Sequence, residues 1–221
     1  MRSERGGISV RVWGRDACFT RPEMKVERVS YDVMTPSAAR GILEAIFWKP
    51  EIRWEIQAID VLRPIRWASV RRNEVSEVIS HRTAAQAMRT GRGNLGFCVD
   101  EHRQQRAALI LQEVAYRIHA RFRLTERAGP GDDPGKYLAM AERRITRGQC
   151  FHRPYLGCRE FAASFGPVDP DEPALDETRD LGWMLYDIDF GRSPPTPQFF
   201  RARLDRGRIA VPTPDAEEVR G

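Results

Sequence analysis

The chain has 221 residues, with 36 lysines and arginines against 31 aspartates and glutamates and a formal net charge of +5. This length is enough to bury a hydrophobic core as one mid-sized domain or two small ones. No stretch approaches the ~20 apolar residues of a membrane-spanning helix, and residues 1–9 lack the apolar segment of a signal peptide. Because most of the positive charge is arginine, the composition fits a nucleic-acid-binding protein and a solvated basic surface about equally well.

The four cysteines (Cys18, Cys98, Cys150 and Cys158) are widely separated and form no CxxC pair. Zinc sites commonly use such closely spaced pairs. We therefore expect neither a metal nor a cofactor. Free thiols of this kind are typical of a reduced, cytoplasmic protein.

Alternating apolar side chains predict a first strand over residues 8–13. Gly14 is expected to end this strand, and a long basic connection follows. A strand-like segment over residues 28–34 then leads into the first helix.

This helix is predicted over residues 37–47. Thr35 can cap it, and Pro36 suits its first position because that N–H would have no helical partner. Pro50 ends the helix, since proline disfavours helical angles in the preceding residue. A second strand is expected over residues 54–63.

Residues 64–111 have a weaker apolar pattern and are predicted to form a mobile insertion, in the shape of a long hairpin. Residues 104–111 fit a returning strand or a short helix equally well. Arg71 and Arg72 are better explained as phosphate contacts than as structural residues, because little apolar sequence surrounds them.

The clearest strand covers residues 114–124, where apolar residues alternate with arginine and histidine. One face is expected to join the core, and the other carries Arg117, His119 and Arg121. A row of like charges on one face repels itself unless an anion lies there. We therefore favour a bound anion over a solvated sheet face.

A second helix is predicted over residues 135–147, followed by a short strand over 159–165. The resulting order, βαββαβ, is that of a ferredoxin-like α+β domain. Such sheets recur in RNA-binding proteins, including those with an RRM-like arrangement, although the fold alone does not define a function.

Residues 167–221 are predicted to form a separate, small antiparallel β domain after the first domain, 1–166. An acidic, proline-containing linker opens it, and strands follow over 183–190 and 198–204. The tail, residues 212–221, is expected to be disordered.

Short motifs run through nearly the whole chain. They are Phe19-Thr20-Arg21-Pro22, Trp48-Lys49-Pro50, Arg63-Pro64-Ile65, Arg71-Arg72-Asn73-Glu74, Arg103-Gln104-Gln105-Arg106, Gly135-Lys136 and Leu156-Gly157-Cys158-Arg159-Glu160-Phe161. In content and order they resemble the Cas-five family of CRISPR-associated proteins, in particular the d-type members of subtype I-C systems.

The resemblance implies a RAMP-superfamily protein that cuts precursor crRNA without a metal and then stays on the crRNA 5′ handle. Its implied partners are the backbone and large subunits of the interference complex (Cascade), with target DNA near the handle. Two alternatives remain: a structural subunit that caps the handle without cutting, and a general ferredoxin-like RNA-binding module outside CRISPR.

In the family, a Tyr or His usually precedes Trp-Lys-Pro, and a Lys-His pair follows the glycine that opens the second helix. The resemblance therefore implies catalytic positions at Phe47, Lys136 and Tyr137. Phe47 cannot move a proton, and a tyrosine with a free pKa near ~10 is a poor base at neutral pH. Only Lys136 retains the family residue, and its ammonium suits the charge of a phosphorane transition state.

Ten residues are candidates for RNA contact: Arg21, Lys25, Tyr31, Trp48, Lys49, Arg71, Arg72, Arg117, His119 and Arg121. For Trp48 a packing role at the helix end is favoured over base stacking. Lys49 also suits a helix C-terminus, where a cation is favoured, and Tyr31 also fits a core position.

Overall fold

The computed structural model describes residues 7–221, so the expectation for the N-terminal segment 1–9 lies largely outside the described residues. The helices are α1 (Pro36–Ile46), α2 (His81–Thr90) and α3 (Pro134–Arg147). The strands are β1 (Gly7–Ala17), β2 (Ile52–Val61), β3 (Arg66–Val75), β4 (Arg103–Leu124), β5 (Ser164–Gly166), β6 (Arg179–Asp189), β7 (Thr196–Leu204) and β8 (Arg208–Ala210).

The main sheet has the order β5-β1-β4-β2-β8, and β3 pairs with β4 beyond this path. All of these pairings are antiparallel. In the centre of the sheet, Ile118 of β4 lies between Val10 of β1 and Ile59 of β2. All three side chains are buried, so this register brings the apolar faces of three strands together.

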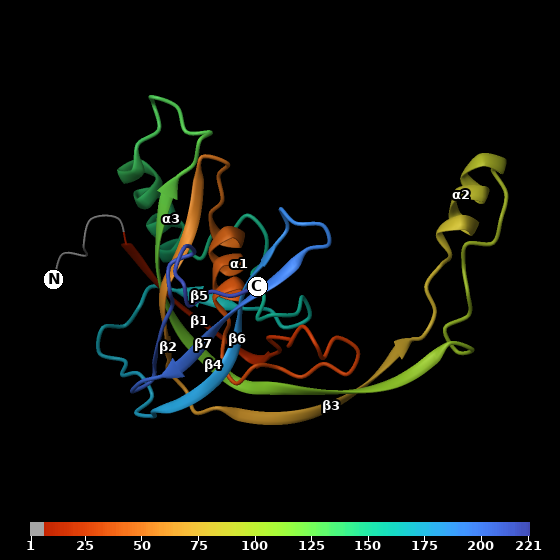
Figure 1. Ribbon diagram of the computed structural model, residues 1–221, viewed down its shortest axis with the longest axis horizontal. Helices are drawn as coiled ribbons and strands as arrows, with labels where there is room; N and C mark the ends of the chain where they lie inside the picture. The colour runs from red at the N-terminus through yellow and green to blue at the C-terminus, as the bar shows by residue number, and fades with distance from the viewer. Residues whose placement is uncertain (1–6) are drawn as a thin grey trace.

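Helices α1 and α3 pack on this apolar face (Figure 1). Thr35 accepts a hydrogen bond from the N–H of Ala38 at the start of α1, as its sequence predicts. Asp133 accepts one from the N–H of Gly135 at the start of α3. Both helices have proline in the first turn, so the prediction that they exist and where they begin is confirmed to within one residue.

Strand β1 differs from its prediction, because it continues through Gly14 to Ala17. A Cβ atom at residue 14 would lie 2.5 Å from Cδ1 of Leu156. The glycine therefore permits close packing and does not end the strand. Two other strands are shorter than predicted: residues 28–34 contribute only isolated bridges at Val29 and Ser30, and the strand expected over 159–165 is reduced to β5.

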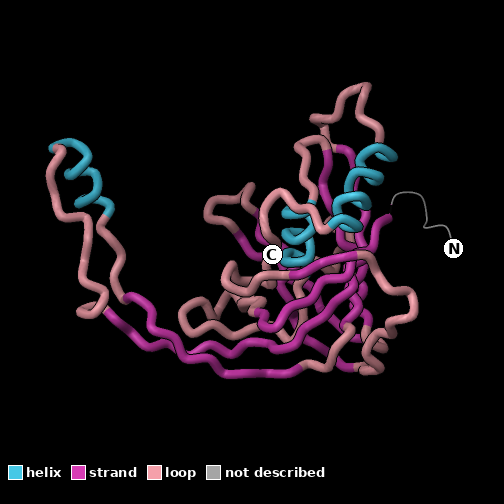
Figure 2. The backbone as a smooth tube through the Cα atoms, turned by 180° about the vertical axis from the view of Figure 1, so that it is seen from behind, coloured by secondary structure: helices cyan, strands magenta, loops and turns pink. Residues whose placement is uncertain are grey.

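The insertion 64–111 is a long hairpin of β3 and the first half of β4, as predicted, with α2 at its tip (Figure 2). Residues 104–111 are strand, so the helical alternative was wrong. No side chain of α2 is buried. The hairpin and α2 are called the arm below.

The C-terminal part contains a two-stranded sheet, β6-β7, while β8 extends the main sheet by pairing with β2. The predicted strands here are confirmed. The tail expected to be disordered is partly ordered, because Phe199 and Arg220 exchange two backbone hydrogen bonds. Among the described residues, no helix has the length and apolar character needed to cross a bilayer.

Candidate functional site

The end of α1 and the start of α3 meet at one end of the sheet. Two hydrogen bonds from Thr125, one to the backbone oxygen of Pro50 and one to that of Glu51, close this end. The loop from residue 125 to 133 then leads to α3 and Lys136. The local fold thus collects three family positions in one place, although they are about 90 residues apart in sequence.

Tyr137 is held by its neighbours. Its ring centroid lies 6.2 Å from that of Phe47 and 6.4 Å from that of Phe122. Its hydroxyl donates a hydrogen bond to Oδ1 of Asp132. This bond to a carboxylate, together with burial, raises the pKa of Tyr137 to about 12. Tyr137 therefore remains protonated at neutral pH and is not a general base.

Lys136 is exposed, and among residues 7–221 its ammonium has no hydrogen bond or ion pair. It is one residue before Tyr137, so it lies next to the Tyr137–Asp132 pair. The hydrogen bond from Tyr137 lowers the pKa of Asp132, and the charges of Lys136 and Lys49 lower it further. Both lysine charges therefore act on one carboxylate, and the exposed ammonium of Lys136 is accessible to a phosphate.

Phe47 is fully buried and caps the end of α1. Its backbone oxygen accepts a hydrogen bond of 2.8 Å from Nε1 of Trp54. The guanidinium of Arg144 lies 5.3 Å from the centre of its ring and donates a 2.7 Å hydrogen bond to the backbone oxygen of Ile46. Phe47 is thus a packing residue that cannot take part in proton transfer.

Trp48 is 56% exposed. The preference for a packing role at this position was therefore wrong, because Phe47 fills the buried place at the helix end. Trp48 and Lys49 instead present an indole and an ammonium to solvent after the end of α1. An exposed indole next to cations can stack on an unpaired base.

Arg21, Lys25 and Tyr31 lie on the segment after β1, apart from Lys136. The Arg21 guanidinium lies 4.4 Å from the centre of the Tyr31 ring and 3.4 Å from the Asp32 carboxylate. Tyr31 is buried, as its core interpretation predicts, and burial raises the pKa of its hydroxyl. Lys25 is exposed.

The basic face of β4 has its counter-charges within the protein. His119 Nε2 lies 2.8 Å from Asp60 Oδ2, and Arg117 lies 3.5 Å from the same oxygen. Arg121 and Arg123 each lie 3.1 Å from Glu55. The argument for a bound anion assumed that no acid faced this row, and that premise was wrong, because β2 carries the acids.

Arg71 and Arg72 lie on β3, at the base of the arm. Arg72 forms an ion pair with Glu160, which also lies 3.3 Å from Arg28. Arg72 therefore has a structural role that its sequence surroundings did not indicate. Arg71 is exposed and remains a candidate phosphate contact.

Three contributors to this geometry escaped the sequence analysis: Asp132, Arg144 and Asp60. Asp132 stands in a turn-rich loop, where an aspartate is ordinary. The only hint in the sequence that Asp132 contacts Tyr137 was its position five residues earlier, just before the helix begins. Arg144 and Asp60 act through contacts across the fold, which a single sequence does not reveal.

Comparison with known proteins agrees with this geometry. The family model Cas_Cas5d, described as CRISPR-associated protein (Cas_Cas5), matches residues 7–212, and the chain belongs to this family. It is 52% identical over 221 residues to the CRISPR pre-crRNA endoribonuclease Cas5d of Mannheimia succiniciproducens, covering 96% of this chain and 98% of the relative.

A second relative has the same name and comes from Thermus thermophilus. It is 43% identical over 230 residues, covering 96% of this chain and 94% of the relative. A solved structure described as a CRISPR-associated protein superposes with a TM-score of 0.69 at 22% identity, covering 97% of this chain and 96% of the other. This last likeness supports the mixed α/β fold.

Proposed function

We propose that this chain is a cytoplasmic endoribonuclease that cuts precursor crRNA without a metal. We also propose that it then stays on the 5′ handle as a subunit of the subtype I-C interference complex, beside the backbone and large subunits and near the target DNA. The names of the two full-length relatives support the cleavage. The antiparallel order β5-β1-β4-β2 supports a ferredoxin-like domain at 1–166, with 167–221 as a smaller β domain.

The proposed reaction uses the RNA's own 2′-hydroxyl. Its oxygen forms a bond to the neighbouring phosphorus while the bond to the 5′-oxygen breaks, leaving a 2′,3′-cyclic phosphate and a 5′-hydroxyl. One proton leaves the 2′-hydroxyl and one is delivered to the 5′-oxygen. The observation that carries this proposal is the ammonium of Lys136, which has no hydrogen bond or ion pair within residues 7–221 and acts with Lys49 on the Asp132 carboxylate. The exposed Trp48, next to Lys49 in sequence, offers a surface on which a base could stack.

Asp132 is the proton acceptor beside Lys136 in this proposal. Its lowered pKa makes it a weak base. Proton transfer by a well-matched group typically contributes ~10²–10⁴ in rate, so we expect cleavage to be slow. A processing enzyme that acts once and keeps its product can function at such a rate.

The second candidate function is that of a subunit that binds the handle without cutting, and Phe47 and Tyr137 favour it. Incubation with the repeat RNA of its own CRISPR array in EDTA separates the two. We expect one specific product that ends in a 2′,3′-cyclic phosphate. Tight binding without that product over several hours would refute the nuclease and leave the structural subunit.

A further inference from the structure

An open cavity of about 680 Å³ lies at the other end of the sheet from Lys136. Its wall is formed by β7, the turn after it and β8, and Asp60 of β2 and Arg117 of β4 form its floor. Asp60 lies eight residues along β2 from Ile52, the end of the strand that adjoins the Lys136 site. At ~3.3 Å per residue, the two places are about 25 Å apart.

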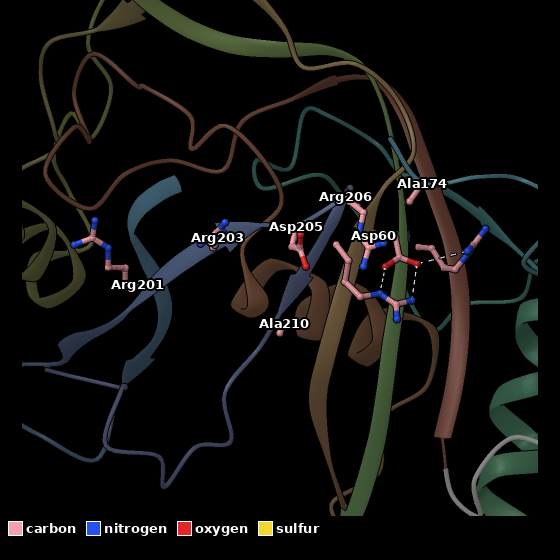
Figure 3. A pocket seen from close by; sticks show the side chains of 9 residues that line it. Asp60, Ala174, Arg201, Arg203, Asp205, Arg206 and Ala210 are labelled. Atoms are coloured by element: carbon pink, nitrogen blue, oxygen red, sulfur yellow. Dashed lines mark hydrogen bonds and ion pairs between the residues drawn. The ribbon is translucent and has the colours of Figure 1, made fainter. Parts of the chain in front are cut away.

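Arginine dominates this cavity. Five arginines line it, with two aspartates and two alanines. Arg201 and Arg203 share one face of β7, and Asp205 and Arg206 follow in the turn after it. Figure 3 shows these side chains in this order toward Asp60. Same-face residues of a strand recur every ~6.6 Å, so Arg201 and Arg203 present their cations about one such step apart.

The floor of the cavity is neutralised. Asp60 is 2% exposed and accepts two hydrogen bonds from Arg208, of 2.6 and 3.1 Å. Arg117 donates a 2.6 Å bond to the backbone oxygen of Glu172. These contacts explain why a buried carboxylate is tolerated here, and they hold the floor rigid.

The wall, in contrast, is only partly neutralised. Arg201 pairs with Asp180. In the part of the chain described by the structure, the guanidinium groups of Arg203 and Arg206 have no hydrogen bond or ion pair. Both residues are exposed on the wall of the cavity. The charge of Arg203 acts on Asp180 without forming an ion pair, so both guanidinium groups are accessible to an anion.

We propose that this arginine cavity binds the phosphate backbone of the RNA, at a second site about 25 Å from Lys136. The inference rests on the proposed function for the identity of the RNA. Planar guanidinium groups match phosphate oxygens in a forked geometry. Interfaces with nucleic acid are strongly positive, whereas the centre of a protein interface is depleted of charge and rich in aromatic residues. This cavity is rich in arginine and contains no aromatic residue among those that line it, so it resembles an interface with nucleic acid.

The double variant Arg203→Gln/Arg206→Gln tests the inference by fluorescence anisotropy with labelled repeat RNA, in EDTA and over a series of KCl concentrations. Each lost phosphate contact lowers the slope of log K against log salt by about 0.7 for single-stranded RNA. We expect the slope to fall by about 1.4 and the affinity to fall about tenfold or more. Unchanged circular dichroism would show that the fold is intact.

The matched control is Arg147→Gln/Arg192→Gln, which removes two exposed arginines from the end of α3 and from the β6–β7 turn. The control should bind RNA like the wild type. An unchanged slope in the cavity variant, or an equal loss in the control, would overturn the inference. The inference would also be overturned if the cavity variant bound RNA normally but no longer bound an oligoglutamate peptide. That result would assign the cavity to an acidic protein segment. Cleavage is measured separately, so failure of the nuclease proposal leaves this result interpretable.

Discussion

Tyr137 and Asp132 form a pair in which Tyr137 cannot accept a proton at neutral pH and Asp132 is only a weak base. The hydrogen bond between them raises the pKa of Tyr137 to about 12 and lowers the pKa of Asp132. The raised pKa favours the protonated form of Tyr137, and the lowered pKa favours the ionised form of Asp132, which are the forms expected at pH 7. The pair therefore positions groups around Lys136 more effectively than it transfers protons.

The substitution Tyr137→His should restore an efficient base. An imidazole has a free pKa near ~6.5, so we expect the single-turnover cleavage rate at pH 7 to rise at least ~10-fold and to gain a titration step near pH 6.5. Tyr137→Phe is the control, because it keeps the ring contacts with Phe47 and Phe122 and should change the rate only a few-fold. If Tyr137→Phe abolished cleavage, the tyrosine hydroxyl itself would be the proton carrier.

Asp60 is the buried charge on which the open face of the sheet depends. Burial alone would raise its pKa, but hydrogen bonds and charge from His119 and Arg208 outweigh burial and lower it. Because the pKa of Asp60 is lower in the folded state, ionised Asp60 makes its full contribution to the free energy of unfolding at pH values above the unfolded pKa, near ~4. This contribution is lost as the pH falls toward the folded pKa.

The variant Asp60→Asn should therefore lose ~2–4 kcal/mol of unfolding free energy at pH 7, because the guanidinium groups of Arg117 and Arg208 are left around a neutral amide. Urea unfolding at pH 7 and pH 3 measures this loss, and the difference from wild type should shrink at pH 3. Asp205→Asn, at an exposed carboxylate of the same cavity, should change stability by less than ~0.5 kcal/mol. If the loss of stability in Asp60→Asn were larger at pH 3 than at pH 7, ionised Asp60 would not be the source of this stability.

Among the helices, α2 at the tip of the arm contributes nothing to the core. Helix α2 buries no side chain, whereas Ile110, at the base of the same hairpin, is 1% exposed in a small cluster with Cys18 and Ala108. The N–H of Ser76 bonds the backbone oxygen of His102 at 2.9 Å, so the two strands are already close where the tip begins. The tip is thus free to serve contacts outside this chain.

Replacing residues 77–101 by an Asn-Gly turn should leave the fold intact. Such a turn suits a two-residue hairpin connection. We expect the Tm to stay within about 4 °C of wild type, equivalent to about 1 kcal/mol for a chain of this size. Ile110→Ala should instead cost ~2–5 kcal/mol. A large drop in Tm on removing the tip would mean that the arm packs against the body in solution.

At the scale of the whole molecule, most elements were predictable because their signals are local. The proline starts of α1 and α3 and the alternation along β4 depend only on neighbouring residues. The features that were misjudged depend on how the chain packs in three dimensions. Gly14 leaves room for the side chain of Leu156, and Trp48 is exposed because Phe47 takes the buried place at the helix end. For the same reason, the row from Arg117 to Arg123 looked uncompensated until β2 was placed beside it.

Lys136 is the residue on which the proposed reaction depends most. It follows a capped helix start, acts with Lys49 on the charge of Asp132 and, within residues 7–221, has no hydrogen bond or ion pair. A cation in this state stabilises charge that develops on a phosphate in the transition state, which is an effect on rate more than on affinity.

Single-turnover cleavage of the repeat RNA by Lys136→Ala tests this role most directly, with Arg147→Ala at the far end of α3 as the control. We expect the rate to fall ~10²–10³-fold, the cost of losing one transition-state charge contact, while the Kd for RNA changes less than about tenfold. Arg147→Ala should cleave like the wild type. A Lys136→Ala rate equal to that of the control would remove Lys136 from the reaction and place the active site elsewhere.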